Sequence, residues 1–355
     1  MINRLLSHDL PRNRWLALAL IAIVLGLAFT PFLFPGTKAL NVAAKILVFI
    51  VLVASFDLLL GYTGIVSFAH TMFFGIGAYG VAIASTRLGP DWGSLAIGTA
   101  AALAVSLLLS LVVGLFSLRV KAIFFAMITL AVASAFLTLA SQLSDFTGGE
   151  DGLNFRVPEA LRPGTQYLDE PLLGASIDGR FLTYYLLFFA AVVLVLAMLR
   201  IVNSPFGRVL QAIRENDFRA EAIGYRTVIY RTLSNVLSAL FATLAGCLLA
   251  LWLRYNGPDT SLSFEIMLDI LLIVVIGGMG TIYGAVIGGV LFVLAQSYLQ
   301  DLMQLGASAV EGIPVLSQLV SPDRWLLWLG ILFVLSVYHF PAGVVGRLRA
   351  QGIKK

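Results

Sequence analysis

Polar residues that could do chemistry are few in this sequence and lie scattered through long apolar runs. Those within the runs are Asn41, Lys45, Asp57, His70, Asn235, Asp269 and Gln296. A carboxylate inside a membrane is costly unless it is paired or hydrated. We expect Asp57 and Glu265 to be hydrated near span ends, and Asp269, one helical turn past Glu265, to lie near the interface. Without a dense array of carboxylates or histidines, an ion- or proton-coupled carrier is disfavoured but stays an alternative.

Motifs for enzyme chemistry are absent from the sequence. It contains no Gly-Lys dipeptide, and therefore no phosphate-binding GxxxxGK[ST] loop, and no HExxH zinc motif. His8 and His339 are isolated, and we interpret His70 as a hydrogen-bonding packing residue rather than a proton relay. The single cysteine, Cys247, excludes a disulfide framework within the chain. We expect no enzyme and no metal site, so any ATP that drives this protein must be hydrolysed by another chain.

The composition predicts a polytopic membrane protein. Of the 355 residues, 59% are hydrophobic and only 12% are charged, whereas about a quarter are charged in soluble proteins. The net charge of +4 does not indicate nucleic-acid binding, because excess arginine in a membrane protein mostly lies in loops and sets orientation.

The apolar runs predict an all-α fold with about ten transmembrane helices in a single domain, residues 1–355. A span needs roughly 20 apolar residues. The run 264–299 is too long for one span and is interrupted by glycines, so we divide it into two helices, the first unusually short. The other expected spans are residues 15–34, 40–60, 62–86, 92–118, 122–141, 181–202, 232–253 and 324–340.

Charge in the loops predicts the orientation. The loop 142–180 carries seven carboxylates against three arginines, a net charge of −4, and the segment 204–231 carries five arginines against three carboxylates, a net charge of +2. Basic residues also lie in the turn 119–121 and the tail 341–355, whereas the segment 300–323 is polar. With both termini in the cytoplasm, every short basic stretch becomes cytoplasmic and the loop 142–180 extracytoplasmic, as the positive-inside rule expects.

The segment 204–231 is the one long, mixed-charge, helix-forming stretch of the chain. Ser204 can cap a helix that begins at Pro205, and Asp217 can cap a second short helix that ends near Gly224. Apolar residues at helical spacing form a stripe: Phe206, Val209, Leu210 and Ile213. The stripe indicates either a face on which another protein docks or an interfacial linker that touches only lipid headgroups.

Glycine is dense in two places. The first group is Gly61, Gly64, Gly75, Gly77 and Gly80, and the second is Gly277, Gly278, Gly280, Gly284, Gly288 and Gly289. Spacing by four puts small residues on one helix face, which allows close helix packing. The alternative is an interrupted helix that lines a transport pathway.

Five segments resemble the motifs of one family. They are GYTGIVSFAHTMFFGIGAYG (61–80), TGGEDGL (147–153), RENDFRAEAIG (214–224), GGMGTIYGAVIGG (277–289) and FPAGVVG (340–346). In this order they resemble the LivM-type permeases of ABC importers for branched-chain, or hydrophobic, amino acids. The resemblance covers the chain from about residue 40 to residue 346.

The resemblance implies a permease of the type II ABC importer kind in the bacterial inner membrane. Its partners would be a LivH-type paralogous permease (or a second copy), two ATPase subunits that hold ATP and magnesium, and a periplasmic substrate-binding protein. The substrate would be a branched-chain or other neutral amino acid, although related importers carry urea, short amides or aromatic acids. Without a mid-membrane arginine to bind a carboxylate, we expect the binding protein to set most of the selectivity.

The resemblance also implies roles for individual residues. Coupling to the ATPase would use an apolar face with rim charges: Phe206, Leu210, Ile213, Arg214, Glu215, Asn216, Arg219, Glu221, Ala222 and Gly224. The pathway or its helix packing would use Gly61, Gly64, His70, Gly75, Gly77, Gly277, Gly278, Gly280, Gly284 and Gly288. The binding protein would contact Thr147, Gly148, Gly149, Glu150, Asp151 and Gly152. The glycine that follows Glu221 by three residues departs from the standard coupling loop, so only the docking role is carried over.

Overall fold

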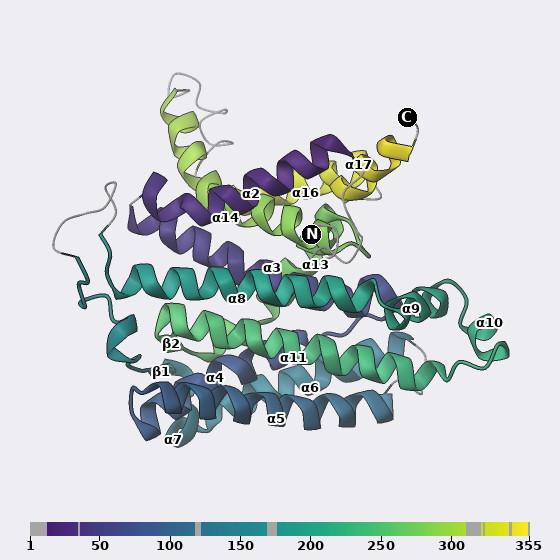
Figure 1. Ribbon diagram of the computed structural model, residues 1–355, viewed down its shortest axis with the longest axis horizontal. Helices are drawn as coiled ribbons and strands as arrows, with labels where there is room; N and C mark the ends of the chain where they lie inside the picture. Colours follow the sequence, from purple (N-terminus) through teal and green to yellow (C-terminus); the bar gives the residue numbers. More distant parts are fainter. Residues whose placement is uncertain are drawn as a thin grey trace.

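The chain is a bundle of long helices, seen here in a computed structural model (Figure 1). The structure describes residues 13–34, 36–117, 122–168, 176–309, 321, 324–340 and 343–353. The expected all-α fold is confirmed. The basic turn 119–121, most of the polar segment 300–323 and both ends of the tail 341–355 lie outside the described residues.

The long helices follow the apolar runs. They are α2 (Arg14–Leu33), α3 (Thr37–Thr63), α4 (His70–Leu88), α5 (Trp92–Ser117), α6 (Ala122–Gln142), α8 (Gly179–Val202), α11 (Thr227–Leu253), α13 (Phe264–Gly277), α14 (Ile282–Ala309) and α16 (Trp325–His339). In the described part of the chain, nine helical segments are long and apolar enough to cross a membrane. Helix α4, rich in glycine and hydroxyl side chains, is not among them, so the expected count of ten is approximate.

Helix α3 lies at the centre of the bundle and is buried along nearly its whole length from Val42. It packs against α8, α11 and α14, and α4 packs between α11 and α5. Peripheral helices α2, α5 and α6 instead expose large apolar side chains such as Trp15, Leu108 and Met127. A bundle whose outer surface is this apolar is suited to lipid rather than water.

The first glycine group changes two expected boundaries. Helix α3 continues to Thr63, where Gly64 ends it with φ of 73°, and α4 begins only at His70. The span expected at 62–86 is therefore shorter and is preceded by a non-helical stretch. The left-handed conformation favours glycine, which has no Cβ to clash.

The expected split of residues 264–299 is confirmed. Helix α13 has 14 residues and follows a single turn, α12 (Pro258–Ser261). Gly278 and Gly280 then adopt positive φ values of 113° and 80° before α14 begins. The helix α17 (Gly343–Ile353) starts against this break, because a Cβ on Gly343 would lie 2.2 Å from the Cα of Gly278. Residues 343–353 of the basic tail thus form a helix, and its first residue packs against the break.

The two charged loops lie at opposite ends of the bundle (Figure 1). At one end are α7 (Ser144–Thr147), the 3-10 turns η1 (Gly149–Asp151) and η2 (Glu159–Leu161), and a small ladder. The ladder pairs β1 (Leu153–Asn154) with β2 (Tyr255–Asn256), with Leu153 opposite Asn256. At the other end are α9 (Pro205–Glu215) and α10 (Asp217–Ala222). This separation agrees with the loop pattern expected from the sequence.

Candidate functional site

Helices α9 and α10 form where the sequence places them, but their caps differ from those expected. Pro205 is the first residue of α9, yet the hydroxyl of Ser204 donates to the carbonyl of Ile201 at 2.6 Å instead of capping α9. Asn216, not Asp217, caps α10, because its side-chain oxygen accepts from the Arg219 N–H at 2.8 Å. Asp217 instead pairs with Arg231 at 2.8 Å. Gly224 has the expected left-handed conformation, with φ of 98°.

The apolar stripe of α9 is not a surface for another protein. Leu210 and Ile213 are 0% and 1% exposed, and Phe206 stacks on Tyr230 with 5.8 Å between ring centroids. Helix α9 uses this stripe to pack against α3, α8 and α11. The expectation that Phe206, Leu210 and Ile213 form the docking face is therefore wrong. An amphipathic helix beside a bundle end buries its stripe in the nearest apolar surface, which here belongs to the same chain.

Helix α10 carries the exposed apolar surface at this end. Phe218 is 84% exposed, and Ile223, just past the helix, is 68% exposed. The charged and small residues expected around a docking face also lie at the surface: Glu215, Arg219, Glu221, Ala222 and Gly224. Glu221 in addition accepts a hydrogen bond from the hydroxyl of Thr227 at 2.6 Å, which ties the end of α10 to α11.

Four residues that are distant in the sequence meet where α9 contacts the end of α3, and we call them the junction: Asp57, Gly61, Arg214 and Gly280. Gly61, Arg214 and Gly280 belong to three of the sequence motifs, and Asp57 lies one helical turn before the first motif. The Gly280 N–H donates to both carboxylate oxygens of Asp57, at 2.8 and 3.1 Å. Arg214 donates through Nη1 to the carbonyl of Gly61. The guanidinium thus points from α9 toward the end of α3 and the break between α13 and α14.

The junction corrects two expectations. Asp57 is 1% exposed and bonded to backbone, so it is not hydrated at a span end. Arg214 binds within this chain and is not purely a rim charge. Gly61 must be glycine here, because a Cβ would lie 2.4 Å from the Gly280 nitrogen.

Other glycines of the two groups make close helix contacts. A Cβ on Gly277 would lie 2.0 Å from the carbonyl oxygen of Gly284, and one on Gly288 would lie 2.5 Å from that of Ile273. In α4, a Cβ on Gly77 would lie 1.9 Å from the carbonyl oxygen of Thr243, and one on Gly75 would meet the side chain of Leu262. These contacts agree with close packing, and the break at 278–281 shows that an interrupted helix is present as well.

His70 is a buried packing residue at the start of α4. Its Nε2 lies 2.9 Å from the hydroxyl of Ser55 and 3.2 Å from the carbonyl of Leu52. Its ring packs edge-on against Phe56. These contacts fix the first turn of α4 on the middle of α3, as expected for a hydrogen-bonding packing role.

The loop 147–152 divides into a buried turn and an exposed acidic tip. Thr147 is buried and donates to the carbonyl of Leu143 at 2.7 Å, and its hydroxyl accepts from the Gly149 N–H at 3.3 Å. Gly148 and Gly152 have positive φ, and a Cβ on Gly152 would lie 2.5 Å from the Asn256 carbonyl oxygen. Of the six residues expected to contact a binding protein, only Glu150 and Asp151 are exposed.

A cluster of three polar side chains from α3, α13 and α14 was not predicted from the sequence. Lys45, Asp269 and Gln296 are joined there by hydrogen bonds. The signal was present, because all three were polar residues in apolar runs, but nothing in the sequence placed their helices side by side. Among the residues that the structure describes, no group of three or more His, Cys, Asp or Glu side chains could hold a metal ion.

The fold defines a polytopic helical membrane protein. Residues 38–337 match the family described as the permease component of the branched-chain amino acid transport system. The chain therefore belongs to that family.

The relatives carry the same description. The high-affinity branched-chain amino acid transport permease LivM of Escherichia coli is 26% identical over 318 residues, covering 86% of this chain and 73% of the relative. LivM of Salmonella typhimurium is 25% identical over 302 residues, covering 81% and 70%. A probable LivM of Methanocaldococcus jannaschii is 24% identical over 234 residues, covering 64% and 61%. No solved structure gives a significant match.

Proposed function

We propose that this chain is a transmembrane permease subunit of an ATP-driven importer of branched-chain amino acids. The observation that carries the proposal is the family match over residues 38–337, which covers most of the membrane bundle. Membership of a transport-system family favours a subunit of an ABC importer over a carrier that acts alone. The printed names of the relatives favour branched-chain amino acids over urea, amides or aromatic acids.

The two ends of the bundle suit two kinds of partner. The basic end with α9 and α10 would face the cytoplasm and dock an ATPase, which would hold ATP and magnesium. The acidic tip at Glu150 and Asp151 would face the periplasm and contact a substrate-binding protein. Both termini would then be cytoplasmic in a bacterial inner membrane, in agreement with the positive-inside rule. A LivH-type permease, or a second copy of this chain, would complete the pathway.

The junction offers a route by which ATPase closure reaches the membrane helices. Exposed Phe218 and Ile223 would contact the ATPase, while the buried stripe of α9 packs this helix against the bundle. Movement of α9 would act through Arg214 on the end of α3 and on the break between α13 and α14. Helix breaks with positive-φ glycines can change direction at low cost, so this point is suited to a gate.

The test is reconstitution of the complete transporter. The chain would be expressed with a LivH-type permease, ATPase subunits and a substrate-binding protein from the same organism, purified and placed in proteoliposomes. We expect ATP-dependent accumulation of leucine, isoleucine or valine that requires the binding protein. Urea and benzoate, at equal concentration, serve as controls. Accumulation of either one in preference to leucine would contradict the substrate assignment, and uptake without any ATPase subunit would contradict the transporter class.

A further inference from the structure

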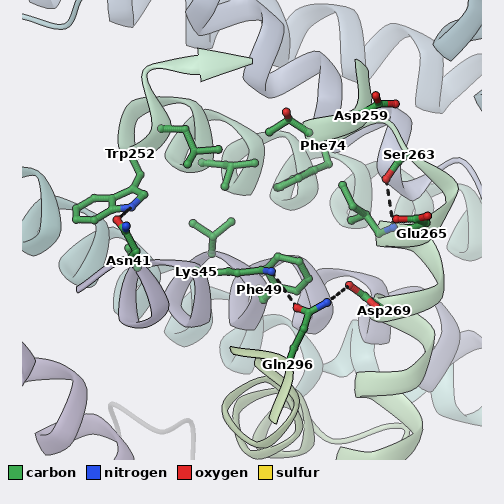
Figure 2. Close-up of a pocket in the computed structure, with 16 residues that line it drawn as sticks. Asn41, Lys45, Phe49, Phe74, Trp252, Asp259, Ser263, Glu265, Asp269 and Gln296 are labelled. Carbon is green, nitrogen blue, oxygen red and sulfur yellow. Dashed lines mark hydrogen bonds between the residues drawn. The ribbon is translucent and has the colours of Figure 1, made fainter. Parts of the chain in front are cut away.

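A cavity of about 470 Å³ opens in the bundle toward the end that carries β1 and β2 (Figure 2). Its walls come from α3, α4, α11, α13 and α14, with α12 at its edge. Lys45 lies eight residues after the start of α3, and Trp252 is in the last turn of α11. The volume is within the range of small-molecule sites, which is roughly 300–1,000 Å³.

The cavity holds a positive and a negative group with one amide between them. Lys45 Nζ donates to Gln296 Oε1 at 2.9 Å, and Gln296 Nε2 donates to Asp269 Oδ2 at 3.4 Å (Figure 2). Lys45 and Asp269 are both only partly buried. Glu265, one turn before Asp269 on α13, also lines the cavity and is exposed. The cavity is thus lined by a cationic side chain, Lys45, and by the carboxylates of Asp269 and Glu265. A ligand in the cavity could contact both kinds of charge.

Ionisable residues in membrane helices are costly, and their usual place is a pathway or binding site. In a structural ion pair, direct contact between the two charges would lower the free-energy cost of placing them in the membrane. Here Gln296 separates Lys45 from Asp269. The 3.4 Å distance from Gln296 Nε2 to Asp269 Oδ2 is longer than the roughly 2.7–3.2 Å that is usual for an N–H···O hydrogen bond. The Lys45 ammonium also lies 5.4 Å from the centre of the Phe49 ring. Among the described residues, neither Lys45 nor Asp269 has a partner of opposite charge within salt-bridge distance.

Much of the remaining wall is apolar, although Asp259, Thr260 and Ser263 also line the cavity. Phe49, Phe74 and Leu249 are buried side chains that line the cavity beside Lys45, and Ile266 lines it on α13. At the mouth, Asn41 accepts from the Trp252 indole at 3.2 Å and from Arg180 at 2.8 Å. The site therefore combines one cation, carboxylates and an aliphatic-aromatic wall.

We propose that this cavity binds a zwitterionic aliphatic amino acid within the membrane domain. The substrate carboxylate pairs with Lys45, its ammonium pairs with Asp269 and Glu265, and its side chain lies against Phe49, Phe74 and Leu249. The proposal rests on the proposed function, because it assigns a place to the amino acid that the importer carries. It also supplies a partner for the substrate carboxylate, Lys45, where the sequence offers no mid-membrane arginine.

The test measures occupancy without the binding protein. In the assembled transporter in nanodiscs, Cys247→Ala removes the native thiol and Ile266→Cys places a reporter in the cavity wall. L-leucine should slow labelling of residue 266 by a small thiol reagent. Leucinol, which lacks the carboxylate, and 4-methylpentanoate, which lacks the ammonium, should each need roughly tenfold or more higher concentration, since each loses one charged pair.

Charge variants identify the two partners. In Lys45→Met, leucine should protect residue 266 no better than leucinol does. In Asp269→Asn, leucine should protect it no better than 4-methylpentanoate does. Lys45→Arg should retain the protection by leucine. Lys38→Met is the matched control, because Lys38 lies two turns away on α3 and pairs with exposed Asp301 at the surface. Melting temperature and co-purification with the ATPase check that each variant is folded.

The outcomes separate this proposal from the proposed function. Leucine uptake in proteoliposomes without leucine-specific protection of residue 266 would overturn the cavity proposal and leave the importer intact. Equal protection by all three compounds would overturn it too. Protection by leucine in a complex that transports no amino acid would support the site and contradict the importer.

Discussion

The backbone N–H of Gly280 donates to both oxygens of the Asp57 carboxylate, at 2.8 and 3.1 Å. These residues are 223 positions apart in the chain, and the carboxylate is buried. The break between α13 and α14 leaves backbone N–H groups without helical partners, and one of them is satisfied by a side chain of the central helix α3. The interrupted helix is therefore fixed to the core of the bundle at its weakest point.

We expect Asp57→Leu to destabilise the protein. Leucine removes the acceptor of the Gly280 N–H, and a buried donor left unpaired costs about 1–3 kcal/mol. Asp57→Asn is the matched control, since its side-chain oxygen can still accept from Gly280. Thermal unfolding of the purified protein in nanodiscs should give a lower melting temperature for Asp57→Leu than for Asp57→Asn. Equal melting temperatures would mean that the bond contributes nothing to stability.

Gly61→Ala should disrupt the contact between α3 and the break between α13 and α14 by overpacking. The added Cβ would lie 2.1 Å from Asp57 Oδ1 and 2.4 Å from the Gly280 nitrogen, so α3 and the break must separate. Such strain costs roughly 1–3 kcal/mol. Gly26→Ala in α2 is the control, because its Cβ would have nothing within 4 Å. A normal yield, melting temperature and uptake for Gly61→Ala would contradict the packing that the structure describes.

Some features of this fold could be predicted from the sequence because they depend on local residue types. Composition and run length predicted the spans, and the glycines at 277–280 predicted the break. Pro205 and Gly224 marked the ends of the α9–α10 segment. Periodicity also predicted the stripe of Leu210 and Ile213, but a stripe does not identify what covers it. The structure covers it with the ends of this chain's own helices.

Other features depend on which helices become neighbours. Asp57 lies close to the end of its helix, so the sequence favoured hydration, whereas Gly280 from a distant motif supplies its partner. Lys45, Gln296 and Asp269 belong to three helices and form a group only after the bundle assembles. Long-range pairing of this kind leaves no pattern in a single sequence.

Arg214→Ala should weaken the link between the α9–α10 segment and the membrane helices. It removes the donor to the Gly61 carbonyl, which lies beside the break. We expect ATP hydrolysis to continue while leucine uptake falls about tenfold or more. Arg208→Ala is the control, because Arg208 is an exposed arginine on the same helix, α9, and lies outside the junction. The measurement compares uptake with ATP hydrolysis in the same proteoliposomes. Similar uptake by both variants would contradict a specific role for Arg214.

Orientation can be measured with single cysteines at the two ends of the bundle. In a Cys247→Ala background, Ser176→Cys lies in the acidic loop and Gln211→Cys lies on α9, and both positions are exposed. A membrane-impermeant thiol reagent applied to intact spheroplasts should label residue 176 alone. Both should be labelled after the membrane is permeabilised. Labelling of residue 211 in intact spheroplasts would reverse the orientation that the charge pattern predicts.

The docking surface for the ATPase should centre on α10 instead of on the stripe of α9. Phe218 is 84% exposed and projects from a helix that Asn216 caps and the Glu221–Thr227 hydrogen bond holds. An exposed aromatic side chain of this kind is a typical energetic centre of an interface, whereas rim charges contribute only about 0–1 kcal/mol.

Phe218→Asp and Ala222→Asp should therefore leave the protein inserted and folded while they reduce co-purification of the ATPase. Leu168→Asp, an exposed apolar position in the loop at the opposite end, is the matched control. Because the side chains of Phe218 and Ala222 are exposed, the melting temperature of the isolated permease should stay the same in all three variants. We expect leucine uptake to fall about tenfold or more for Phe218→Asp. Full ATPase co-purification and full uptake in that variant would make the segment an interfacial linker and would contradict its coupling role.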